Sequence, residues 1–118
     1  MPDEPWFDEE AFAALRKTVN GTVFQRLLKL FVENTTSRLE EIMQLDPIGE
    51  PERLAVALHA LKGSALMVGA RELETTAEGL RSVARHREAA DIEQQRKRLE
   101  AAVMRVHDRV RQELTVSD

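Results

Sequence analysis

Apolar residues recur at three- and four-residue spacings along most of the chain, which is the pattern of amphipathic helices. A short first helix is expected over residues 9–19, where Asp8 can cap the N-terminus. A break at residues 20–21 follows, and Thr22 can cap a long second helix that continues to about Leu45.

Proline and glycine limit the later helices. Residues 46–49 are expected to form a loop, because the residue before a proline avoids the helical region. A third helix is expected over residues 51–68, since proline suits its first turn and Gly69 is the favoured residue just beyond a helix C-terminus. A fourth helix is expected over residues 70–87, and Asp91 can cap a fifth.

Four long helices joined by short loops imply an antiparallel four-helix bundle. The short additional N-terminal helix would cover this bundle as a lid, and Trp6 and Phe7 would fold back onto it. A chain of 118 residues has the usual size of one domain, so residues 1–118 are expected to form a single all-α domain. The absence of Cys excludes disulfides, thiolate nucleophiles and cysteine metal sites.

Charge and hydropathy narrow the class of partner. A net charge of −4 argues against a nucleic-acid-binding protein, which would need an excess of basic residues. No apolar run approaches the roughly 20 residues that span a bilayer, and the acidic start differs from a signal peptide. We therefore expect a cytoplasmic monomer whose partner is another protein, and neither a nucleic acid nor a membrane.

The third predicted helix sorts its side chains into two faces. A helical wheel at about 100° per residue places five apolar side chains on the core face: Leu54, Leu58, Leu61, Ala65 and Val68. His59 lies nearly opposite the centre of that face, with Lys62 and Gly63 beside it one turn later. The histidine is therefore expected to point outward.

Each of these three residues has a chemical reason for its place. Neutral imidazole is a good nucleophile near physiological pH and can take a phosphoryl group reversibly. Lys62 supplies a positive charge that can attract phosphate or stabilise phosphohistidine, while its ammonium group stays solvated. A glycine costs about 1 kcal/mol relative to alanine inside a helix. Gly63 therefore indicates a surface left bare for the approach of a partner's active site.

This helix resembles the signature of the histidine phosphotransfer family in the run His59-Ala60-Leu61-Lys62-Gly63-Ser64-Ala65, followed by Gly69 and Leu73. The resemblance covers the whole chain and implies a phosphoacceptor at His59, a basic neighbour at Lys62 and a small neighbour at Gly63. It implies that the phosphoryl group is exchanged with aspartates on receiver domains of a hybrid sensor kinase or a response regulator. Those domains would bring their own Mg²⁺. The resemblance therefore implies a carrier in a multistep phosphorelay, not an enzyme, with no cofactor, ATP site or metal of its own.

Four further side chains are predicted to contact the partner. Leu66 is an apolar residue on the same strip as His59, and Met67 lies towards the edge of that strip. Both could meet an apolar docking surface on a receiver. Glu52 and Arg71 could form a polar rim around the contact.

The other two histidines lack the lysine-glycine context. His86 is expected near a helix end, where a positive group interacts favourably with the helix dipole, and is interpreted as structural or neutral. His107 falls among charged residues of the last helix and is expected to be solvated. Neither is therefore a candidate phosphoacceptor.

Two alternative functions stay open. The chain could be a phosphoacceptor domain cut from a larger hybrid or chemotaxis-type kinase, but the initiating Met1 and the polar end at residues 115–118 favour a free-standing protein. It could also be an adaptor bundle that binds a partner without phosphorylation. The presence of His59 in its full context argues against an adaptor.

Overall fold

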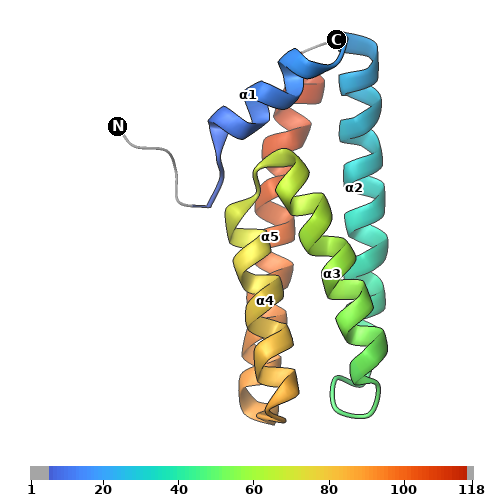
Figure 1. Ribbon diagram of the computed structural model, residues 1–118, viewed down its shortest axis with the longest axis vertical. Helices are drawn as coiled ribbons and strands as arrows, with labels where there is room; N and C mark the ends of the chain where they lie inside the picture. Colours follow the sequence, from blue (N-terminus) through green and yellow to red (C-terminus); the bar gives the residue numbers. More distant parts are fainter. Residues whose placement is uncertain (1–5, 117–118) are drawn as a thin grey trace.

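The computed structural model describes residues 6–116, and within that range the secondary structure is entirely helical. Its helices are α1 (Glu9–Thr18), α2 (Gly21–Gln44), α3 (Pro51–Val68), α4 (Arg71–Arg85) and α5 (Ala89–Val116) (Figure 1). Met1 and the last two residues, on which the expectation of a free-standing protein partly rests, lie outside this range. In the described part of the chain, every helix is too short or too polar to cross a membrane.

The four long helices form a closed bundle. Helix α3 packs against α2 and α4, and α5 packs against α4 and α2. Each of these four helices therefore has two neighbours among the other three. Helix α1 lies across one end, where it contacts α2 and α3 (Figure 1). The predicted all-α antiparallel bundle with an additional N-terminal helix is therefore confirmed.

Two predicted N-terminal caps are wrong. Helix α2 begins at Gly21 because the side-chain oxygen of Asn20 accepts the N–H of Val23 at 2.9 Å. Asn is at least as good a cap as Thr, so Asn20, which was interpreted only as part of a break, caps the helix in place of Thr22. Helix α5 begins at Ala89, so Asp91 lies inside the first turn. Its negative charge interacts favourably with the helix dipole there.

Gly69 ends α3, as predicted, and also makes room for α1. Its φ of 83° lies in the left-handed region that glycine adopts without strain. A Cβ atom at this position would lie 2.7 Å from the carbonyl oxygen of Asp8, and the N–H of Asp8 donates to the Gly69 carbonyl at 2.7 Å. The end of α3 and the start of α1 therefore touch through backbone atoms.

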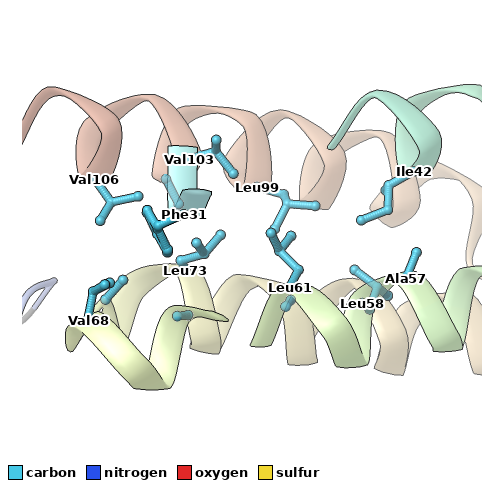
Figure 2. Close-up of a cluster of buried hydrophobic side chains, with 14 of the residues drawn as sticks. Phe31, Ile42, Ala57, Leu58, Leu61, Val68, Leu73, Leu99, Val103 and Val106 are labelled. Carbon is cyan, nitrogen blue, oxygen red and sulfur yellow. The ribbon is translucent and has the colours of Figure 1, made fainter. Parts of the chain in front are cut away.

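The core runs along the bundle axis and continues under α1. Aromatic and aliphatic side chains from α2, α3, α4 and α5 interdigitate there, among them Phe31, Leu61, Leu73 and Leu99 (Figure 2). Phe7 is fully buried in the same cluster, and Trp6 packs against it. The prediction that the segment before α1 folds back onto the bundle is confirmed.

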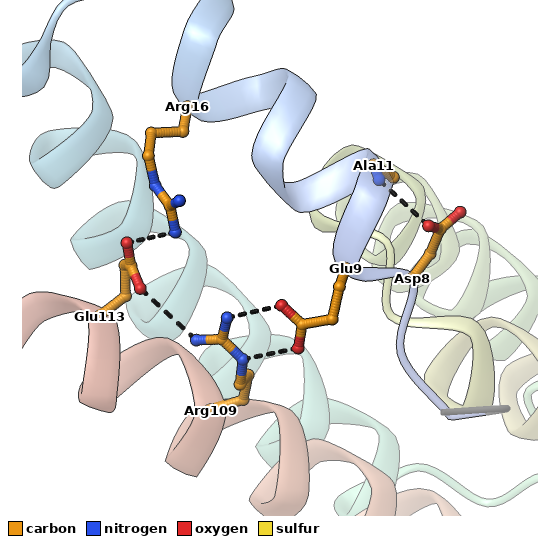
Figure 3. A network of polar contacts seen from close by, with 6 residues as sticks. All are labelled: Asp8, Glu9, Ala11, Arg16, Arg109 and Glu113. Carbon is orange, nitrogen blue, oxygen red and sulfur yellow. Dashed lines mark hydrogen bonds and ion pairs between the residues drawn. The ribbon is translucent and has the colours of Figure 1, made fainter. Parts of the chain in front are cut away.

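Ion pairs fix α1 to α5. Arg109 donates two hydrogen bonds to the carboxylate of Glu9, at 2.9 and 2.7 Å (Figure 3). Glu113 lies between Arg109 and Arg16 and pairs with both. The hydrogen bond from Arg109 is the main reason that the pKa of Glu9 is lowered. This network secures the lid that the sequence predicted.

Candidate functional site

Helix α3 presents the candidate site on its outer face. Every residue predicted for its core face is buried: Leu54, Leu58, Leu61, Ala65 and Val68. His59 is exposed, so its predicted outward direction is confirmed. Within residues 6–116 its imidazole ring makes no hydrogen bond or ion pair. The exposed ring is therefore open to a hydrogen-bonding or reacting group of another molecule.

Lys62 is held more firmly than the sequence indicated. Its ammonium lies 2.9 Å from Oε1 of Glu78 on α4, and about a third of its side chain is exposed. The hydrogen bond from Lys62 lowers the pKa of Glu78, which therefore stays ionised at neutral pH. The ammonium thus stays at the surface, as expected, and α4 in addition places a carboxylate within its reach.

Gly63 has open space where a side chain would be. A Cβ atom built at this position would have no heavy atom within 4 Å outside the local helix backbone. Packing therefore does not require a glycine at this position. Alanine would also stabilise the helix by about 1 kcal/mol, so the glycine has no structural advantage here. This bare stretch of α3 lies one turn beyond His59.

Apolar side chains lie along the helix on both sides of His59. Leu66 is 56% exposed and Met67 is 38% exposed, as their predicted role in docking requires. Val56 is 66% exposed and lies three residues before His59, so it belongs to the same outer strip. Sequence reasoning missed Val56, although its helical spacing from the histidine was sufficient to identify it.

A surface groove between α2 and α3 extends this apolar region. Leu27 and Leu30 line it from α2, and Gly63, Ser64 and Met67 line it from α3. Leu30 itself is 43% exposed. An apolar surface that spans two helices beside an accessible histidine has the character of a protein-docking site.

The two polar residues of the predicted rim lie at different places. Glu52 is exposed in the first turn of α3, two turns before His59. Arg71 lies beyond the other end of α3 and pairs with Asp8 at 2.9 Å. The structure thus gives Arg71 a role in holding the segment before α1, and contact of either residue with a partner stays a prediction.

The expectation that His107 is solvated is wrong. Its side chain is buried, and Nε2 lies 2.6 Å from the hydroxyl oxygen of Thr35 on α2. That hydroxyl donates to the carbonyl of Phe31 at 2.7 Å, so we infer that Nε2 of His107 carries a hydrogen and donates to Thr35. Burial, reinforced by Arg111, lowers the pKa of His107. This histidine is a neutral part of the core.

His86 is at the C-terminal end of α4, as predicted. Its Nδ1 lies 2.8 Å from the carbonyl oxygen of Ser82, one turn earlier. It therefore satisfies a carbonyl at the helix end. This contact agrees with the structural role expected from the sequence.

In the described part of the chain, His, Cys, Asp and Glu side chains form no group of three or more that could hold a metal ion.

The outer face of α3 combines an accessible imidazole, an ammonium one turn away, a bare backbone and an apolar border. Such a face can offer a nucleophilic nitrogen to a group held by another protein.

The comparisons with known proteins agree with this geometry. The family model described as Hpt domain matches residues 26–115. The matched segment includes most of α2, all of α3 and α4, and nearly all of α5. Comparison with curated proteins gave no match.

Two solved structures share the fold. Histidine-containing phosphotransfer protein B from Pseudomonas aeruginosa superposes with a TM-score of 0.85 at 23% identity, covering 96% of this chain and 97% of that one. A putative histidine-containing phosphotransfer protein from rice gives a TM-score of 0.82 at 18% identity, covering 95% of this chain and 81% of that one. At these identities the likeness shows the fold.

Proposed function

The chain belongs to the Hpt domain family, and we propose that His59 is the side chain on which it receives and passes on a phosphoryl group. The observation that carries this assignment is the contrast among the three histidines. His59 is exposed with a free ring, His107 is buried against Thr35, and His86 contacts the end of its own helix. Only His59 has a lysine and a bare glycine one turn away.

The proposed reaction moves one phosphoryl group between two side chains. A ring nitrogen of neutral His59 attacks the phosphorus of an aspartyl phosphate on a receiver domain. The new P–N bond forms as the P–O bond to the aspartate breaks, and the carboxylate leaves with the bonding electrons. The ring becomes cationic and carries a dianionic phosphoryl group, so charge balances. Attack by a second receiver's aspartate reverses these steps and restores the imidazole.

Lys62 and Gly63 would support this exchange in different ways. The ammonium of Lys62 can interact with phosphoryl oxygens and offset the charge near the transferred group. The bare backbone at Gly63 lets the receiver's active site approach without a steric clash. The chain would then act as a carrier, with Mg²⁺ supplied by the receiver and no cofactor of its own.

The receiver would dock on the apolar border of the site. Val56, Leu66 and Met67 lie along α3 around His59, and the groove between α2 and α3 continues their surface. Apolar contacts of this kind can align the two active sites before transfer. We place the exchange in the cytoplasm and assign it to a monomer, with receiver domains as partners and no role for nucleic acid or membrane.

Label transfer from a phosphorylated receiver tests the assignment. The native chain should acquire acid-labile label, and His59→Gln should acquire none while keeping its helical circular-dichroism spectrum. His86→Gln is the matched control, because it makes the same change at another exposed histidine. It should be labelled like the native chain. Equal labelling of the native chain and His59→Gln would refute the proposal.

A further inference from the structure

We propose that Glu78 of α4 is a positioning residue that competes with the phosphoryl group on His59 for Lys62, and so keeps that group transferable. The proposal rests on the proposed function of His59. It concerns a residue in a different helix from the histidine and its two neighbours. Sequence spacing does not connect Glu78 with them, because 16 residues separate it from Lys62.

The contact of Lys62 with Glu78 sets the resting position of the lysine. The ammonium nitrogen lies 2.9 Å from Oε1 of Glu78, within hydrogen-bond distance. Lys62 leaves α3 one turn after His59, whereas Glu78 lies on the neighbouring helix. In the unphosphorylated protein, therefore, the ammonium that would serve the phosphoryl group is turned towards a carboxylate on α4.

Glu78 remains a negative charge throughout the proposed cycle. Its hydrogen bond with Lys62 is the main cause that lowers its pKa, and Arg81 and Arg85 act in the same direction. The carboxylate therefore stays ionised when a dianionic phosphoryl group arrives on His59. Lys62 then has two possible anionic partners, the carboxylate of Glu78 and the phosphoryl group.

Arg81 gives Glu78 a second partner when Lys62 moves. Its guanidinium lies 3.9 Å from the same Oε1 atom, one turn further along α4. Lys62 can thus exchange Glu78 for the phosphoryl group while Arg81 continues to neutralise the carboxylate. Lys62 cannot fully neutralise the phosphoryl group, because the negative charge of Glu78 stays close to the same ammonium. The phosphohistidine is consequently held less tightly than it would be with Lys62 alone.

If Glu78 had a purely structural role, its replacement would affect folding stability rather than the phosphoryl equilibrium. Both side chains of the pair are substantially exposed, and ion pairs of that kind contribute little to folding stability. Loss of the Glu78 charge should therefore leave the fold almost unchanged. Its effect should appear in the distribution of phosphoryl groups between the two proteins.

The test measures that distribution at equilibrium with a single receiver. Glu78→Gln keeps the size of the side chain and removes its charge. It should shift the equilibrium towards phosphorylated His59 by about 3- to 10-fold, a coupling typical of neighbouring charged groups, and should lengthen the phosphohistidine lifetime. Glu72→Gln is the matched control, because Glu72 also lies on α4 and pairs with another helix through Arg105 at 3.7 Å. It should change the equilibrium less than about 2-fold.

A double variant tests whether Glu78 acts through Lys62. In a Lys62→Ala background, Glu78→Gln should shift the equilibrium by clearly less than it does in the native background. Equal shifts in the two backgrounds, or no shift in either, would overturn the proposal. The function itself would fail in another way, because the native chain would then take no label on His59.

Discussion

His59 and His107 are the same residue type in opposite surroundings. His59 lies on the outer face of α3 with a free ring, whereas His107 lies in the core with Nε2 against the hydroxyl of Thr35. A nucleophile needs a lone pair that its target can reach. The donated hydrogen bond and the burial of His107 remove that possibility at Nε2, whereas the exposed ring of His59 makes no hydrogen bond within the described residues.

The comparison shows that position on the helix, rather than local sequence polarity, separates an exposed histidine from a buried one. His107 is followed by Asp108 and preceded two residues earlier by Arg105, which suggested a solvated environment. It also lies four residues after Val103 and three before Val110, and both are buried. Helical spacing therefore places it beside the core stripe of α5.

The largest expected effect is on stability, from His107→Ala. This change removes a buried ring and its hydrogen bond to Thr35, and should lower the free energy of unfolding by about 2 kcal/mol. Denaturant unfolding would measure the loss, with the exposed His86→Ala as control. Phosphoryl transfer to His59 should survive at temperatures well below the unfolding transition. Loss of transfer in a folded His107→Ala variant would break the distinction between the two histidines.

The next effect concerns the open space beside His59. Gly63→Ala should raise the free energy of unfolding by about 1 kcal/mol, because alanine favours a helix and no packed neighbour opposes its methyl group. Transfer from a receiver should become slower despite that gain. Ser64→Ala provides a small change at the adjacent position. A Gly63→Ala protein that is more stable and equally fast would remove the close-approach role from Gly63.

The smallest expected effect is a pH dependence of stability that comes from His107. Burial lowers its pKa in the folded state, so the unfolded chain binds a proton more readily. Stability should therefore fall as the pH decreases below the ordinary histidine value of about 6.5. One proton can account for a loss of at most about 1 kcal/mol between pH 7.5 and 6.

Thermal unfolding across that pH range would measure this dependence. His107→Ala should flatten it, whereas His86→Ala should leave it unchanged. The carboxylates with lowered pKa, Asp8 and Glu9 among them, add their own loss only at lower pH, below their unfolded values. An identical slope in the native chain and His107→Ala would contradict the assignment of a buried neutral histidine.

Much of the fold followed from local signals in the sequence. The bounds of α3 agree with prediction because Pro51 and Gly69 mark its two ends. The start of α2 was misplaced because Asn20 and Thr22 are both good caps, and local propensity does not choose between them. The outward direction of His59 needed only the helical period.

Contacts between side chains of different helices could not be predicted from local sequence patterns. The pair between Lys62 and Glu78 depends on the register of α3 against α4, which no short spacing encodes. The hydrogen bond between Thr35 and His107 joins residues 72 positions apart. The sequence therefore predicted the exposed face of α3 that carries His59, while tertiary packing supplied the residues that contact Lys62 and His107 from other helices.

Nuclear magnetic resonance of the imidazole nitrogens tests the central claim most directly. The protein would be labelled with ¹⁵N, and its three histidines would be followed as a phosphorylated receiver is added. Phosphorylation should change the ring signals of His59 to those of phosphohistidine, while His107 keeps the signals of a neutral, hydrogen-bonded ring. Phosphohistidine signals from His86 or His107, with the ring of His59 unmodified, would contradict the account.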